Sequence, residues 1–157
     1  MTPKKDHPGV YPPPPLFYVL TFLISIFFQN KIPLSTTFLE TDISFIMGLI
    51  FVMLGILFIL PALIKFFKTK NTLITIKPAN SLQTTGIYSI SRNPMYLGLL
   101  SIYIGVAFFK GNYWTFILIP IVILVITYFV ILKEEKYLSR TFETDYTDYK
   151  KKVRRWI

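Results

Sequence analysis

The sequence predicts an all-α integral membrane protein with about four transmembrane helices and a C-terminal amphipathic helix at the cytoplasmic interface. Of its 157 residues, 53% are hydrophobic, which leaves too little polar surface to cover a soluble domain of this size. The hydrophobic residues form long runs, and a bilayer core of roughly 30 Å is crossed by about 20 helical residues. The chain has no cysteine and a single histidine, which excludes disulfides and thiolate chemistry and gives no reason to expect a metal site.

The elements follow one another as a single membrane domain over residues 1–157. Residues 1–15 are rich in proline and predict an extended entry into the first span. Spans are expected near residues 16–34, 43–64, 94–109 and 112–132. Pro61 lies close enough to the end of the second span to kink or terminate its helix, and Pro120 lies inside the fourth. Lys110-Gly111-Asn112 predicts a tight helical hairpin between the third and fourth spans.

Residues 133–157 are expected to form a cytoplasmic tail that continues the fourth helix out of the bilayer. Apolar side chains recur in it at intervals of three or four residues, at Leu138, Phe142, Tyr146, Tyr149 and Val153. Lysines and arginines occupy the other face, so the tail predicts an amphipathic helix along the interface. Trp156 is a candidate anchor at the level of the lipid headgroups.

Basic residues set the expected orientation. All 17 lysines and arginines except Lys31 and Lys110 fall on one side of the four spans. The positive-inside rule makes that side cytoplasmic, so both termini are expected there, as in a multi-pass protein of a bacterial inner membrane. The formal net charge of +9 belongs mostly to this face. It favours membrane lipids with anionic headgroups, and not nucleic acid, as the partner.

A helix start at Asn93-Pro94 is the first candidate for chemistry. Asparagine caps a helix through its side-chain oxygen, and proline is suited to the first helical position. The free backbone N–H groups beside Arg92 would then form a site for a carboxylate or phosphate. The alternative is an ordinary capped helix, with Arg92 as an interfacial anchor.

Glu134 and Glu135 are the second candidate. Neither has a cation three or four residues away on the predicted helix, and neighbouring residues point about 100° apart. One carboxylate is therefore expected to face a cofactor and the other to brace the cytoplasmic loop. The alternative is two solvated charges where the span leaves the bilayer.

Two tyrosines and a glycine complete the candidates. Tyr88 and Tyr96 flank Arg92 at minus four and plus four, where an aromatic ring could stack on adenine or contact a sulfonium, or simply belong to the interfacial aromatic belt. Gly98 would permit close approach of a ligand, or of a neighbouring helix through small-residue packing.

The blocks Gly86 to Gly98 and Lys133 to Leu138 together resemble the Arg-(His/Asn)-Pro-x-Tyr-x-Gly and Glu-Glu signature of the isoprenylcysteine carboxyl methyltransferase and phospholipid methyltransferase superfamily. The similarity runs from about Lys65 to Ile157 and includes Lys77-Pro78 and the closing Val153 to Ile157. The resemblance implies that the loop, the helix start and the Glu pair enclose S-adenosyl-L-methionine, and that a lipid or prenylated acceptor enters from the membrane.

The expected site follows from the motif and from the residues themselves. The resemblance implies a cofactor pocket formed by Arg92, Asn93, Pro94, Tyr96, Glu134 and Glu135. Tyr88 is added because its ring could stack on adenine or contact a sulfonium, and Gly98 because it would permit close approach of a ligand. Arg92 is the expected catalytic residue because it could orient a carboxylate. No metal is expected.

The family pattern has departures in this chain. Asn93 stands where the eukaryotic carboxyl methyltransferases have histidine, Phe142-Glu143 replaces the usual Phe-Gly, and Lys65 to Thr85 contains no Gly-x-Gly. A carboxylate acceptor is already nucleophilic, whereas an amine must first lose a proton and the site has no histidine. We therefore expect methyl transfer to an isoprenylcysteine-like carboxylate. The alternatives are a phospholipid N-methyltransferase, an NADPH-dependent membrane sterol or enone reductase, and a non-enzymatic four-helix membrane protein.

Overall fold

The computed structural model describes residues 7–71 and 78–157, and within them the chain is helical without a strand. This confirms the all-α prediction. The helices are α1 (Pro14–Lys31), α2 (Asp42–Lys68), α3 (Pro94–Lys110), α4 (Tyr113–Ile117), α5 (Ile119–Ile126), α6 (Leu132–Thr141) and α7 (Glu143–Lys152). Short 3-10 turns lie at Thr37–Glu40 and Gly86–Ser89, and a π-helical turn at Thr127–Ile131 joins α5 to α6. The basic residues Lys4, Lys5 and Lys77 lie outside the described residues.

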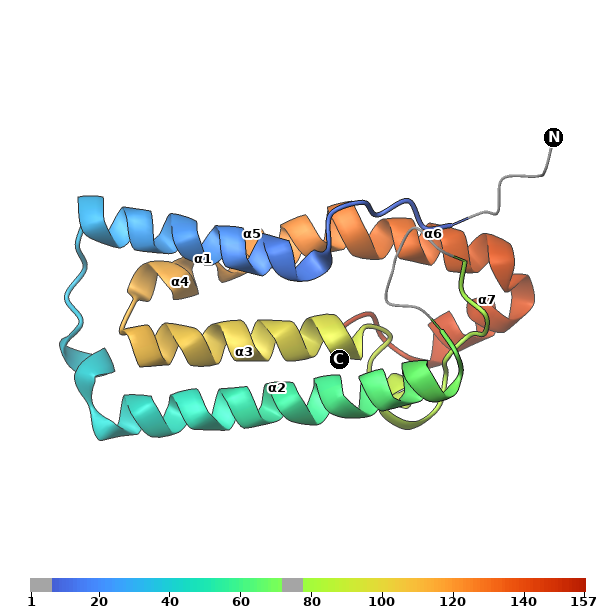
Figure 1. Ribbon diagram of the computed structural model, residues 1–157, viewed down its shortest axis with the longest axis horizontal. Helices are drawn as coiled ribbons and strands as arrows, with labels where there is room; N and C mark the ends of the chain where they lie inside the picture. Colours follow the sequence, from blue (N-terminus) through green and yellow to red (C-terminus); the bar gives the residue numbers. More distant parts are fainter. Residues whose placement is uncertain (1–6, 72–77) are drawn as a thin grey trace.

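The long helices lie side by side along the longest axis (Figure 1). The connection from α1 to α2 and the turn from α3 to α4 lie at one end, on the left of the figure. The loop between α2 and α3, the helix pair α6 and α7, and the start of α1 lie toward the other. Residues distant in sequence therefore meet at this second end, which we call the loop end.

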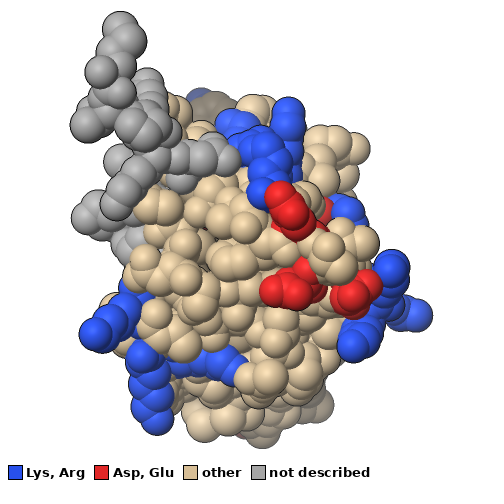
Figure 2. All heavy atoms as spheres, turned by 90° about the vertical axis from the view of Figure 1, so that its right-hand side faces the viewer, with Lys and Arg blue, Asp and Glu red and all other residues tan. Residues whose placement is uncertain are grey.

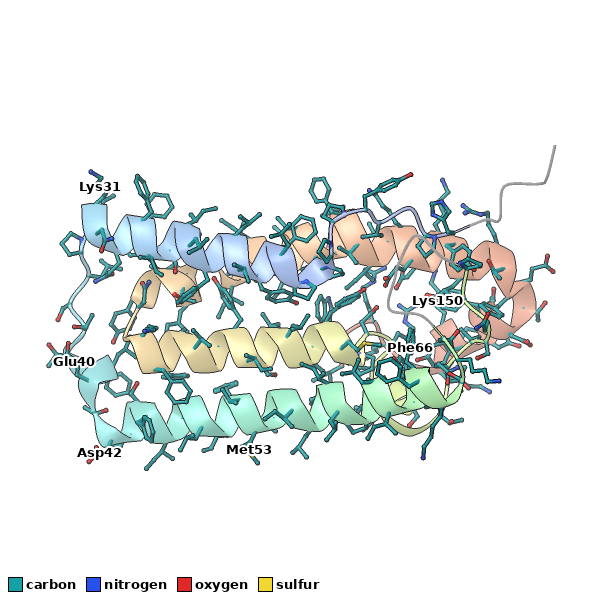
Figure 3. All side chains as sticks on the ribbon, in the orientation of Figure 1. Lys31, Glu40, Asp42, Met53, Phe66 and Lys150 are labelled. Atoms are coloured by element: carbon teal, nitrogen blue, oxygen red, sulfur yellow. The ribbon has the colours of Figure 1, made fainter. Side chains whose placement is uncertain are left out.

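Helix α2 is the one described helix that is both long enough and apolar enough to cross a bilayer. Only 17% of its most apolar window is buried, whereas a core helix of a soluble protein would be mostly buried. Met53 projects outward from it (Figure 3), and Leu57 and Phe45 are likewise exposed. Exposed apolar side chains along a helix suit a lipid environment. The remaining three spans stay predictions.

Helices α2 and α3 pack through two pairs of glycines. A Cβ added to Gly98 would lie 2.8 Å from the carbonyl oxygen of Gly55, and one added to Gly105 would lie 2.8 Å from that of Gly48. The two glycines of each helix are seven residues apart, so the two backbones stay in close contact over about two turns. This packing fixes the start of α3 against the end of α2.

The structure corrects two expectations about proline. Pro61 does not terminate α2, because the helix continues to Lys68, and the kink that was its alternative stays a prediction. The fourth hydrophobic run is not one α-helix: it breaks at Leu118 and restarts with Pro120 in the second position of α5. Proline lacks an N–H, so this early position is the one where it costs no helical hydrogen bond.

The C-terminal tail is two helices and not one amphipathic helix. It reverses at Phe142-Glu143, where Glu143 has a φ of 38°, in the left-handed region that favours glycine. After the reversal, Tyr146, Tyr149 and Val153 pack in a buried cluster with Leu82, Leu138 and Phe142. Trp156 packs, partly buried, against the core of the bundle, and its place at the level of the lipid headgroups stays a prediction. The apolar stripe thus faces the protein.

Candidate functional site

A cavity of about 380 Å³ lies at the loop end, within the range of roughly 300–1,000 Å³ typical of small-molecule sites. Its apolar wall includes Ile59 and Leu63 of α2 and Leu99 of α3. Seven of the eight predicted site residues line it: Tyr88, Arg92, Asn93, Pro94, Tyr96, Glu134 and Glu135. The exception is Gly98, which lies in the α2–α3 interface, where Gly55 and Ile59 would block any added side chain.

Asn93 does not cap α3 through its side chain. Its Nδ2 instead donates to the carbonyl oxygen of Arg155, 2.9 Å away. The backbone N–H of Arg92 donates to the carbonyl oxygen of Arg154 at 3.0 Å, and the Ser91 hydroxyl donates to that of Arg155 at 3.3 Å. The C-terminal tail therefore lies against the start of α3, and the predicted side-chain cap is not formed.

Glu135 lies between two arginines. Arg155 donates from Nε to Oε1 at 2.9 Å and from Nη2 to Oε2 at 2.8 Å, which is a two-point pairing. Nη2 of Arg92 lies 3.2 Å from Oε1, with 8% of the Arg92 side chain and 9% of that of Glu135 exposed. Arg92 is thus buried in an ion pair and is not an interfacial anchor.

The surroundings of Glu135 favour its charged form. Burial by itself would raise the pKa of this carboxyl, but the hydrogen bonds from Arg155 and the charges of Arg92 and Arg155 outweigh it. The pKa of Glu135 therefore lies below its ordinary value, and the carboxylate stays ionised at neutral pH.

Glu134 has a different environment. The Tyr96 hydroxyl donates to its Oε1 at 2.7 Å. Desolvation by the apolar wall raises the pKa of Glu134 to about 7, the Tyr96 hydrogen bond opposes this, and the neighbouring charge of Glu135 adds to it. The helix thus turns one carboxylate to the arginines and the other to the cavity, where it exchanges a proton near neutral pH.

Two hydrogen-bond donors of the cavity have no protein partner among the described residues. They are Nε of Arg92 and the hydroxyl of Tyr88, and both atoms are buried. Burial raises the pKa of Tyr88, so its hydroxyl remains a donor at neutral pH. Because buried donors are normally paired, these two indicate where an oxygen atom of a ligand would bind.

Three tyrosines from α6 and α7 hold the loop over the cavity. The hydroxyl of Tyr137 accepts from the backbone N–H of Ala79 at 2.8 Å, and that of Tyr149 donates to the carbonyl of Tyr88 at 2.6 Å. Nη1 of Arg92 donates to the Tyr146 hydroxyl at 3.4 Å. The ring of Phe66, near the end of α2 (Figure 3), stacks on Tyr88 with centroids 6.2 Å apart.

Sequence reasoning missed Arg155 and these tyrosines as parts of the site. Tyr146 and Tyr149 were visible as part of the apolar stripe and Tyr137 was not, and their hydroxyls act only once the tail folds back. Arg155 gave no local signal because its partner Glu135 lies 20 residues away. The repeated Arg154-Arg155 in the closing block of the motif was the available clue.

Comparison with known proteins extends these observations. A family model described as phospholipid methyltransferase matches residues 43–145. An uncharacterized protein of Haemophilus influenzae (strain Rd) is 44% identical over 63 residues, which is 40% of this chain and the whole of that relative. No solved structure matches.

The matched range runs from the start of α2 to the start of α7 and includes Arg92 and the Glu pair. It therefore covers most of the chain and the helix-start motif together with both carboxylates. This agrees with the superfamily indicated by the motif residues. The chain belongs to the phospholipid methyltransferase family.

Proposed function

We propose that this protein transfers a methyl group from S-adenosyl-L-methionine to a lipid-borne acceptor at the membrane face. The observation that carries the proposal is one cavity whose lining brings together Arg92, the two carboxylates Glu134 and Glu135, two donors without a partner among the described residues, and an apolar wall. Polar recognition and a hydrophobic path in one site are what a polar cofactor and a lipid acceptor require.

The residues of the cavity fit this cofactor. Its amino-acid end carries a carboxylate, for which Arg92 Nε and the Tyr88 hydroxyl offer hydrogen-bond donors. The faces of Tyr88 and Tyr96 can attract a sulfonium. When bound, S-adenosylmethionine supplies an electrophilic methyl group, and the protein contributes orientation and exclusion of water.

The exposed surface supports a membrane setting. Figure 2 shows the loop end face on, with Lys and Arg side chains gathered around its edge. A basic rim beside the exposed apolar flank of α2 fits anionic headgroups next to acyl chains. The proposal therefore includes a multi-pass protein of a bacterial inner membrane, with both termini and the cavity on the cytoplasmic side.

Glu134 bears on the choice of acceptor. The expectation of a carboxylate acceptor depended on the lack of a histidine, which leaves a glutamate or water to take the proton of an amine. Glu134 faces the cavity with a pKa of about 7. It can accept a proton from a lipid ammonium group and leave a neutral amine with a free lone pair. We therefore favour a phospholipid amine as acceptor; the family's description names a phospholipid as the substrate. An isoprenylcysteine-like carboxylate, oriented by Arg92, is the second candidate.

Ligand binding by the purified, detergent-solubilised protein tests the cofactor. We expect binding of S-adenosylmethionine and of S-adenosylhomocysteine, and none of NADPH. Preferential binding of NADPH would favour the reductase, and binding of neither would favour a non-enzymatic membrane protein. Arg92→Ala should lose the binding of both sulfur compounds.

The fate of a labelled methyl group tests the acceptor. The protein is incubated with methyl-labelled S-adenosylmethionine and total membrane lipid, and the labelled lipid is treated with base. An N-methyl group survives this treatment, whereas a methyl ester releases methanol. Base-stable label supports the amine, base-labile label supports the carboxylate, and unlabelled lipid contradicts methyl transfer to either.

A further inference from the structure

The cluster of two arginines around Glu135 has a consequence beyond the proposed function, on which it rests. Arg92 and Arg155 share one carboxylate, so one positive charge remains in excess. Arg92 lines the cavity, and its Nε is buried without a partner among the residues that the structure describes. Arg155 has about a third of its side chain exposed and is absent from the cavity wall.

The geometry divides the two arginines unequally. Arg155 engages both oxygens of Glu135 through its planar fork, at 2.9 and 2.8 Å, while Arg92 reaches one oxygen at 3.2 Å with a single nitrogen. Glu135 is therefore held mainly by Arg155. Without that hold, the carboxylate could turn to pair with Arg92 at two points, and no positive charge would remain in excess.

We propose that Arg155 is a positioning residue that neutralises Glu135 from the C-terminal tail and so leaves Arg92 free to bind an anionic group of the ligand. The backbone of the tail supports this role. The carbonyls of Arg154 and Arg155 accept hydrogen bonds from Arg92, Ser91 and Asn93. Val153 and Trp156 fix the tail on either side by packing in the two buried clusters.

The experiment measures S-adenosylhomocysteine affinity of the full chain in detergent, by calorimetry, for the wild type and three variants. Arg155→Gln removes the excess charge and should weaken binding about tenfold or more. The double variant Glu135→Gln, Arg155→Gln leaves Arg92 with an unshared charge and should bind more tightly than Arg155→Gln alone. Lys152→Gln removes a cation from an exposed position on the last turn of α7 and should bind within about twofold of wild type.

The rescue by the second substitution separates this role from a merely structural one when the two variants have the same melting temperature in detergent, because Glu135→Gln also removes a buried carboxylate that Arg155→Gln leaves underpaired. If the double variant binds no better than Arg155→Gln, or if Arg155→Gln binds like Lys152→Gln, the inference is overturned. Should Arg155→Gln fail to insert, Arg155→Lys serves in its place: it keeps the cation and should lose less than tenfold, and a complete loss would contradict the charge argument. A wild type that does not bind the probe would instead refute the proposed function.

Discussion

The hydrogen bond between Tyr96 and Glu134 makes a prediction about the pH dependence of methyl transfer. Tyr96 donates to the carboxylate at 2.7 Å and so stabilises its charged form. Removing the hydroxyl in Tyr96→Phe should therefore raise the pKa of Glu134. If Glu134 is the base, activity rises with pH as this carboxyl loses its proton, and the midpoint of the rise should move upward in the variant.

The size of the shift follows from the bond. A hydrogen bond to a charged group contributes about 1.5–3 kcal/mol, and 1.36 kcal/mol corresponds to one pH unit. Glu134 is partly exposed to the cavity, so water would replace some of the lost bond. We expect the midpoint to move from about 7 to about 8.

The assay is the rate of transfer at saturating cofactor and lipid, measured between pH 5.5 and pH 9.5. Tyr103→Phe is the matched control, since it deletes a hydroxyl on the same helix that has no partner among the described residues. Its midpoint should equal that of wild type. A Tyr96→Phe midpoint that does not move, or a Glu134→Gln variant that keeps the same rise, would refute the assignment of Glu134 as base.

Further predictions concern the carboxylates, the arginine, the helix packing and the orientation. Glu134→Gln should remove the rise in rate with pH but retain folding. Glu135→Gln should lower the melting temperature in detergent, because it removes the ion-pair partner of two arginines. If both variants have equal and negligible effects on rate and melting temperature, the two carboxylates are solvated charges. Arg92→Ala should abolish turnover in a protein that still inserts, and Arg92→Lys should be impaired because it lacks the fork; full activity of Arg92→Ala would exclude Arg92 from the site. Gly98→Val should destabilise the α2–α3 interface by about 1–3 kcal/mol or more, and an unchanged melting temperature would contradict the close approach seen there. A cysteine at Lys152 should be labelled only from the cytoplasmic side, and labelling from the outside would reverse the topology.

Local patterns in the sequence predicted the features that depend on neighbouring residues. Asn93-Pro94 correctly marked the start of α3, because proline at the first helical position is determined by the adjacent backbone. The divergence of Glu134 and Glu135 followed from the helical repeat alone. The same reasoning failed for the Asn93 side chain, whose Nδ2 donates to the carbonyl of Arg155, 62 residues away, while its oxygen caps no N–H of α3.

Features that depend on tertiary packing could not be predicted in the same way. The stripe of Tyr146, Tyr149 and Val153 has the spacing of a helix that faces a membrane, and that spacing is the same for one that faces the protein. The decisive event is the reversal at Glu143, whose positive φ is unusual for a residue other than glycine. The usual Phe-Gly of the family would predict this turn, but this chain has Glu143 in place of the glycine, so its sequence carries no turn signal there.

The buried arginine cluster is better explained by ligand binding than by stability. Taking charges out of water is costly, and a buried ion pair can often be replaced by apolar side chains without loss of stability. Arg92 and Glu135 are both more than nine-tenths buried, yet Arg92 keeps an unpaired Nε beside a cavity large enough for a small molecule. A protein selected for stability alone would gain nothing from that unpaired donor. A bound ligand oxygen that accepts a hydrogen bond from this Nε would satisfy the buried donor. Ligand affinity and melting temperature should therefore be measured on the same variants, so that a loss of binding can be distinguished from a loss of stability.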